Sequence, residues 1–183
     1  ISFPKSFIWG TATASHQVEG NCENNWSEFE KGFKNNGDPN IKDGQISGLA
    51  CDHWERYKSD IELIKSLGVK HYRFSLEWSK IEPELGVYND EALNHYSDVI
   101  DGLLKNNIEP VITLHHFSHP IWFDKLGAFE KEKNISHLVS FSEKVFSHFS
   151  DRVKYWCTIN EPGVVAIQGY FTGMFPPGET NGQ

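Results

Sequence analysis

The chain has 183 residues, enough for one domain with a substantial hydrophobic core. Its 25 acidic and 17 basic residues give a formal net charge of −8, which argues against a nucleic-acid partner because phosphate binding needs a basic surface. No apolar stretch approaches the roughly 18 residues of a membrane span, and three widely spaced cysteines favour a reducing compartment over a disulfide framework.

The first 50 residues are predicted to hold one short strand and a long loop. An apolar run at residues 7–14 favours the strand, and residues 20–50, rich in Gly, Asn and Asp, are predicted to form a long ordered loop. The start of the chain lacks the apolar core of a signal peptide, so we expect a cytoplasmic protein. The first residue is Ile1 rather than methionine, which is consistent with a processed or truncated chain.

Helices and strands then alternate. Apolar residues at three- and four-residue steps predict a helix over residues 54–67, and Gly68 is placed as its C′ glycine before a strand at residues 69–76. A second helix of the same kind begins at Asn89 or Asp90, either of which can cap its first turn.

The pattern continues to the Asn-Glu-Pro segment. A strand is predicted over residues 110–115, and a third helix is predicted to begin near Ser136 with that serine as its N-cap. The apolar run at residues 153–159 predicts a fourth strand, which ends at Asn160.

Strands that alternate with helices indicate βαβ units and a parallel sheet, so the fold class is α/β. Two architectures fit this pattern, an open doubly wound sheet and a (β/α)8 TIM barrel. No glycine-rich nucleotide turn occurs, and polar residues follow four successive strands, which favours the barrel. A complete barrel needs about 250 residues. We therefore predict that residues 1–183 form the N-terminal half of a single barrel domain and supply roughly its first four βα units.

The segment Asn160-Glu161-Pro162 is the strongest candidate for chemistry. A strand that ends at this point aims both polar side chains out of its carboxyl end, where ligands bind in parallel α/β folds. The amide can hydrogen-bond a substrate hydroxyl, and the carboxylic acid can give or take a proton. A strand-end Glu exposed to water is the alternative for this segment taken alone.

Other strand ends add groups of suitable kinds. Gln17 offers a donor and an acceptor for two adjacent sugar hydroxyls, His116 can donate to another, and Arg73 can hold a second carboxylate ionised. The aromatic rings of Phe117 and Trp122 follow the third strand, so both are candidate substrate-binding residues. For Trp122 and Phe123, an outer sugar subsite and simple packing remain open.

No metal or other cofactor is predicted. His115, His116 and His119 resemble a metal cluster, but consecutive strand residues point to opposite faces and no carboxylate or thiolate is spaced to complete the site. Cys157 lies within a predicted strand and is expected to be a buried, inert thiol.

Several conspicuous residues have simpler explanations. Glu77 and Glu82 are interpreted as solvated carboxylates, since charged groups are mostly exposed. Trp9, Trp54 and Trp156 are interpreted as core residues.

Together, the strand-end segments closely resemble glycoside hydrolase family 1, the β-glucosidase family. The resemblance spans essentially the whole chain in the family's order. Its main stretches are Trp9-Gly10-Thr11-Ala12-Thr13, Gln17-Val18-Glu19-Gly20, Tyr72-Arg73-Phe74-Ser75, Thr113-Leu114-His115-His116-Phe117, Thr158-Ile159-Asn160-Glu161-Pro162 and Gly173-Met174-Phe175-Pro176-Pro177-Gly178.

The resemblance implies a (β/α)8 barrel that hydrolyses β-glycosides with retention of configuration. Glu161 would be the acid/base and Asn160 the partner of the sugar 2-hydroxyl. Gln17 and His116 would grip the non-reducing sugar, and Arg73 would neighbour the nucleophile. The implied partners are a β-glycoside substrate and the C-terminal half of the barrel, either covalent or as a separate chain.

One departure from the family is large. The family's nucleophile lies in a Thr-Glu-Asn-Gly segment, and these 183 residues contain no such segment. Smaller departures occur at Ser118-His119-Pro120, where Asp-Leu-Pro is frequent, and at 127–129, where Gly-Gly-Trp is usual. We therefore expect the chain alone to be inactive, and a non-catalytic sugar-binding or structural half-barrel remains an alternative.

Overall fold

A computed structural model describes residues 2–180 as one four-stranded parallel sheet with helices. Each strand pairs with the next along the chain, in the order β1-β2-β3-β4. The strands are β1 (Gly10–Ala12), β2 (His71–Ser75), β3 (Glu109–His115) and β4 (Tyr155–Ile159). In register, Val111 of β3 lies between Arg73 of β2 and Tyr155 of β4.

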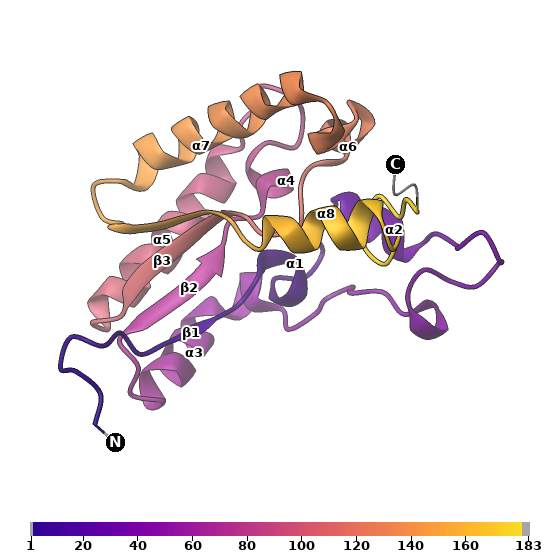
Figure 1. The fold of residues 1–183 in the computed structure, drawn as a ribbon. Helices are drawn as coiled ribbons and strands as arrows, with labels where there is room; N and C mark the ends of the chain where they lie inside the picture. Colours follow the sequence, from indigo (N-terminus) through magenta and orange to yellow (C-terminus); the bar gives the residue numbers. More distant parts are fainter. Residues whose placement is uncertain (1, 181–183) are drawn as a thin grey trace.

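Three long helices connect the strands and pack along the sheet (Figure 1). They are α3 (His53–Ser66), α5 (Asp90–Lys105) and α7 (Ile135–Phe149). The shorter elements are α1 (Ser15–Val18), α2 (Asn25–Glu30), η1 (Lys42–Gly44), α4 (Trp78–Ile81), α6 (Ile121–Lys125), η2 (Ala128–Glu130), η3 (Glu132–Asn134) and α8 (Pro162–Tyr170). None of the helices in the described residues is long and apolar enough to cross a membrane.

The hydrophobic core lies between the sheet and these three helices. Alternate strand residues such as Tyr72, Phe74 and Ile112 are buried there against apolar side chains of α3, α5 and α7. The register neighbours Arg73 and Val111 are only partly buried, and Tyr155 is exposed. One face of the sheet is therefore covered and the other is largely open.

The strand order separates the two architectures that fit the sequence. A doubly wound sheet reverses its strand order and carries helices on both faces, whereas a barrel adds each strand beside the last with its helices outside. Here the order is sequential and the core lies on one face. The prediction of the first four βα units of a TIM barrel is confirmed.

Local signals placed the long helices correctly, with one exception. Asn89 caps α5 by accepting hydrogen bonds from the backbone N–H groups of Glu91 and Ala92. The prediction that Ser136 caps the third helix is wrong. That helix begins at Ile135, and the Ser136 hydroxyl donates to the Lys133 carbonyl from within the first turn.

The N-terminal region differs most from the prediction. The first strand covers three residues rather than eight, and Trp9 is 54% exposed rather than part of the core, because it packs against two exposed phenylalanines before the sheet begins. Residues 20–50 contain α2, closed by a capping box between Asn24 and Ser27. Trp54 and Trp156, predicted as core residues, are partly buried and pack against the edge of the core. Cys157 is only half-buried, because β4 is an edge strand here.

Candidate functional site

The turn from β4 into α8 presents Glu161 at the carboxyl edge of the sheet. The backbone N–H of Asn160 donates to the His115 carbonyl at 2.9 Å, so pairing with β3 extends one residue beyond β4. Glu161 then adopts the left-handed conformation, with φ 45° and ψ 60°, and Pro162 occupies the first helical position. A non-glycine residue rarely adopts this conformation, and it sits here where the strand must turn abruptly into a helix. The Glu161 side chain is left exposed.

Asn160 lies between Arg73 and Glu161. The Arg73 guanidinium donates from Nη2 to Asn160 Oδ1 at 3.2 Å, and Asn160 Nδ2 lies 3.5 Å from Glu161 Oε2. Because Arg73 can only donate, the contact fixes the amide with its oxygen toward the cation and its N–H₂ toward the acid. The Asn160 amide is therefore aimed at the place where a substrate beside Glu161 would lie.

The Arg73 guanidinium has donor capacity left over. Its Nε is buried and has no hydrogen-bond partner within the described residues. A buried guanidinium N–H normally finds an acceptor, and a carboxylate satisfies it best. Arg73 is only partly buried and lies on the face of the sheet that the helices leave open.

His116 follows β3 at the same edge. Burial lowers the pKa of the half-buried His116, and the Arg73 cation lowers it further, while Glu161 acts in the opposite direction. His116 is therefore a neutral imidazole near pH 7, and its Nδ1 has no partner in residues 2–180. The Phe117 ring stands edge-on to the His116 ring, with 4.9 Å between the ring centroids. The backbone of Phe117 has a positive φ of 70°.

The other two predicted substrate-binding residues, Gln17 and Trp122, lie in different parts of the structure. Gln17 is exposed on α1, just after β1, and so lies at the same edge of the sheet. Trp122 packs edge-on against Trp78 and Phe123, and its indole N–H donates to the Glu82 carbonyl at 2.9 Å. These contacts lie in the helical layer, so they favour the packing alternative for Trp122 over a sugar subsite.

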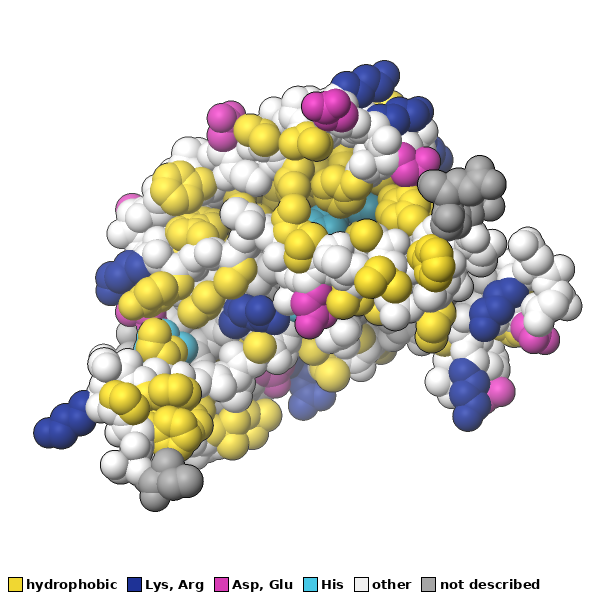
Figure 2. All heavy atoms as spheres, in the orientation of Figure 1, with side chains coloured by type: hydrophobic (Ala, Val, Ile, Leu, Met, Phe, Trp, Pro, Cys, Tyr) yellow, Lys and Arg dark blue, Asp and Glu magenta, His cyan; other side chains and the backbone are white. Residues whose placement is uncertain are grey.

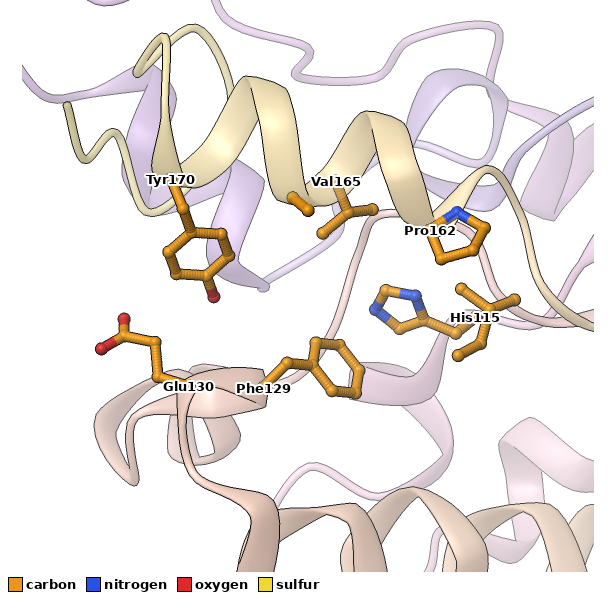
Figure 3. Close-up of a pocket in the computed structure, with 8 residues that line it drawn as sticks. His115, Phe129, Glu130, Pro162, Val165 and Tyr170 are labelled. Carbon is orange, nitrogen blue, oxygen red and sulfur yellow. The ribbon is translucent and has the colours of Figure 1, made fainter. Parts of the chain in front are cut away.

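A cavity of about 410 Å³ opens beside the Asn160 turn (Figure 3). It lies between α8 and η2, and its walls are almost entirely apolar, with Phe129, Val165 and Tyr170 among them. His115 points into it, is fully buried, and has a pKa lowered to about 3 by burial and by two neighbouring histidines. Within residues 2–180 no group of three or more His, Cys, Asp or Glu side chains is placed to hold a metal ion.

Comparisons with known proteins identify the family of this chain. The sequence model described as "Glycosyl hydrolase family 1" matches residues 1–183. The chain belongs to glycosyl hydrolase family 1. It is 40% identical over 178 residues to 1,4-beta-D-glucan glucohydrolase of Thermotoga neapolitana, a match that covers 96% of this chain and 42% of that protein. It is also 38% identical over 186 residues to human cytosolic beta-glucosidase, covering 97% and 39% of the two chains.

Solved structures of the family match the fold as well. A family 1 β-glucosidase from Thermotoga maritima superposes with a TM-score of 0.92 at 39% identity, covering 98% of this chain and 41% of that one. The same enzyme in complex with deoxynojirimycin gives a TM-score of 0.91 at 40% identity, covering 98% and 42%. This family 1 chain thus spans about two fifths of the length of the relatives that it matches.

The structure of this chain also buries carboxylates that the sequence did not reveal as buried. Glu77 is 0% exposed and Glu82 is 3% exposed, so the interpretation of both as solvated groups is wrong. Each is buried because hydrogen-bond donors surround it. Glu82 accepts from Trp78 Nε1 at 2.7 Å and from the backbone N–H of Gly86 at 2.8 Å.

Glu19 is a third buried carboxylate, and sequence reasoning missed it. It accepts a hydrogen bond from the Tyr96 hydroxyl at 2.7 Å and lies 3.9 Å from Lys80 Nζ. Burial, reinforced by the charge of Glu77, raises the pKa of Glu19 to about 8, although Lys80 opposes this. Glu19 lies in a stretch that resembles the family, but no local pattern marked it as buried, because its neighbours come from segments 58 to 77 residues away.

Glu19 gives this protein a predictable loss of stability with rising pH. The folded state keeps the Glu19 proton up to about pH 8, whereas an unfolded glutamate loses its proton near 4.5. The folded state therefore binds more protons between these values, so stability falls as pH rises through that window. For a fully buried group the total effect is roughly 3–5 kcal/mol.

We expect Glu19→Gln in the full-length protein to flatten this dependence, because the amide stays neutral. The free energy of unfolding of both forms would be measured in urea from pH 5 to 8.5. Glu91→Gln, on the exposed first turn of α5, is the control and should leave the profile unchanged. Parallel profiles for wild type and Glu19→Gln would show that Glu19 is ionised in the folded state.

Proposed function

We propose that this chain works as the N-terminal half of a retaining β-glycosidase, with a β-glycoside as substrate. The C-terminal half of the barrel completes it, either in the same polypeptide or as a separate chain. The proposal rests on two successive side-chain contacts at the carboxyl edge of the sheet, from Arg73 to Asn160 and from Asn160 to Glu161. Membership of family 1 supports it, as does the resemblance to proteins described as β-glucosidases.

Each residue has a distinct role in this proposal. Glu161 protonates the leaving oxygen and afterwards takes a proton from the attacking water. Asn160 donates from its N–H₂ group to the 2-hydroxyl of the sugar, which explains why its oxygen is held by Arg73 and its amide faces Glu161. Hydrogen bonds to that hydroxyl strengthen in the transition state of glycoside hydrolysis.

The second carboxylate comes from the completing half of the barrel. In retaining enzymes the two carboxyls lie about 5–5.5 Å apart, and one of them forms a covalent glycosyl intermediate. The Arg73 guanidinium, whose Nε has no partner within the described residues, lies beside that nucleophile in this proposal and keeps it ionised by its positive charge. Gln17 and the neutral His116 bind hydroxyls at the non-reducing end of the sugar, and Phe117 provides a flat apolar surface beside them.

The proposal is tested on the full-length protein with paired aryl α- and β-glycosides. Hydrolysis of the β-glycoside with the β-anomer as the first product, seen by NMR, is expected. Binding without turnover would favour the non-catalytic alternative, and a first-formed α-anomer would exclude a covalent intermediate.

We expect Asn160→Ala to lower kcat/KM for the β-glycoside by about 10²-fold, since one hydrogen bond that strengthens in the transition state is lost and Glu161 loses its neighbour. Asn106→Ala is the matched control. That amide caps the distant end of α5 by donating to the Gly102 carbonyl at 3.0 Å. Equal activity of the two variants would show that Asn160 does not contact the substrate.

A further inference from the structure

Glu77 is a fully buried carboxylate with four hydrogen-bond donors. Its Oε2 accepts from the hydroxyls of Ser15 at 2.8 Å and Ser118 at 2.9 Å. Its Oε1 accepts from the Ser79 hydroxyl at 2.8 Å and from Asn24 Nδ2 at 3.1 Å. Four acceptor sites is the capacity of an ionised carboxylate, so every lone pair of Glu77 is used.

The donors belong to different segments of the candidate site. Ser15 begins α1, the helix that carries Gln17 two residues later. Ser118 lies two residues after His116, in the turn that follows β3. The two hydroxyls converge on the same carboxylate oxygen and lie 3.4 Å from each other. Glu77 therefore joins the Gln17 segment to the His116 segment at a single atom.

Asn24 extends the same network around α1. Its Oδ1 accepts from the Ser27 backbone N–H at 3.0 Å, so its N–H₂ group faces both Glu77 and Nδ1 of His16, 3.2 Å away. The Nδ1 of His16 is then an acceptor, and its Nε2 donates to Glu30 at 2.8 Å. Helix α1 is thus held at Ser15 by Glu77 directly and at His16 through Asn24.

We propose that Glu77 is a positioning residue that sets the spacing between Gln17 and His116 without touching the substrate. This role rests on the proposed function, because it concerns the two side chains proposed to hold the non-reducing sugar. Small displacements of binding groups are costly: a shift of about 1 Å is enough to lose roughly 10²-fold in rate. A side chain that ties both segments to one atom limits such displacements.

Glu82 provides a matched control for Glu77. It has the same side chain, is nearly as buried, and lies at the other end of α4, but its donors are Trp78 and Gly86 rather than residues of the sugar-binding segments. In the full-length protein, Glu77→Ala and Glu82→Ala should both lower the thermal midpoint. We expect Glu77→Ala alone to weaken the binding of deoxynojirimycin and to raise KM by about 10- to 100-fold.

Glu77→Gln should rescue the affinity to within about threefold of wild type. The Gln oxygen can accept from Ser79 and Asn24, and the rotatable hydroxyls of Ser15 and Ser118 can accept from its N–H₂ group. Rescue would show that the geometry of the hydrogen bonds, rather than the charge, sets the spacing. Loss of affinity in Glu77→Gln equal to that in Glu77→Ala would overturn this part of the inference.

A milder pair of variants tests the role even if Glu77→Ala does not fold. Ser118→Ala removes a 2.9 Å bond to Glu77 from the His116 segment, and Ser79→Ala removes a 2.8 Å bond to the same carboxylate from α4. We expect Ser118→Ala to weaken deoxynojirimycin binding by about 3- to 10-fold and Ser79→Ala by less than about twofold. Equal effects would make Glu77 merely structural.

Amide hydrogen exchange separates this inference from the proposed function. Faster exchange at residues 15–18 and 116–119 in Ser118→Ala, but not in Ser79→Ala, is expected whether or not the protein binds a sugar. Unchanged exchange would overturn the positioning role. Wild-type protein that neither binds deoxynojirimycin nor hydrolyses a glycoside would instead overturn the proposed function.

Discussion

Glu161→Gln in the full-length protein should slow hydrolysis of an alkyl β-glycoside by about 10²–10⁴-fold, the usual contribution of a general acid. An alkoxide is a poor leaving group and needs the proton that Glu161 provides. A dinitrophenyl glycoside needs little protonation, so kcat/KM for that substrate should fall much less. Azide should partly restore the second step, because a small anion attacks without a base.

Glu130→Gln is the control for this variant, since Glu130 is also exposed and lies near α8. The thermal midpoint of Glu161→Gln should match that of wild type, because the carboxylate is exposed and its contact with Asn160 is long. A large rate loss can then be attributed to chemistry. The same loss on both substrates, without rescue by azide, would contradict the assignment of Glu161 as acid/base.

Residues 1–183 expressed alone should associate and show no measurable glycoside hydrolysis. β1 pairs only with β2, and β4 only with β3, so the sheet has two unpaired edges within the described residues. Apolar side chains are also spread over the face of the molecule that Figure 2 shows. The side chains of Tyr155, Ile167 and Phe171 are exposed. Unpaired edges and apolar patches of this kind favour association.

Light scattering and amide exchange on the lone segment would measure this effect. Addition of a C-terminal half that carries the family's Thr-Glu-Asn-Gly segment should give a discrete species and restore turnover. The same half with its nucleophilic glutamate changed to glutamine is the control: it should restore the discrete species but not turnover. A monodisperse monomer with strongly protected amides in β3 and β4 would show that the four-stranded unit is a self-sufficient domain.

Helical periodicity and strand-end chemistry were enough to predict most of the fold and the candidate acid. The three long helices follow apolar residues spaced by three and four, a pattern that depends on local sequence alone. Asn160 and Glu161 could also be recognised from local sequence alone, since a polar pair between an apolar run and a proline marks a strand end. The contact of Asn160 with Arg73, 87 residues earlier, required the structure.

The buried carboxylates could not be predicted in this way. Burial of Glu77 depends on Ser15 and Ser118, which lie 62 and 41 residues away along the chain, and no local pattern joins such serines to a glutamate. The error for Trp9 has a similar origin. An aromatic residue has the same appearance in a sequence whether another layer covers it or not, and Trp9 lies before the covered part of the sheet.

The sequential strand order also affects how the chain folds during synthesis. Because β1, β2, β3 and β4 pair in the order in which they leave the ribosome, each new strand meets an edge that has already formed. Pairing can therefore advance from the N-terminus without waiting for distant segments, which is the usual direction of folding on the ribosome. The face of the sheet that the helices leave open stays exposed after these four strands have paired, so we expect aggregation to compete with folding for longest at that face.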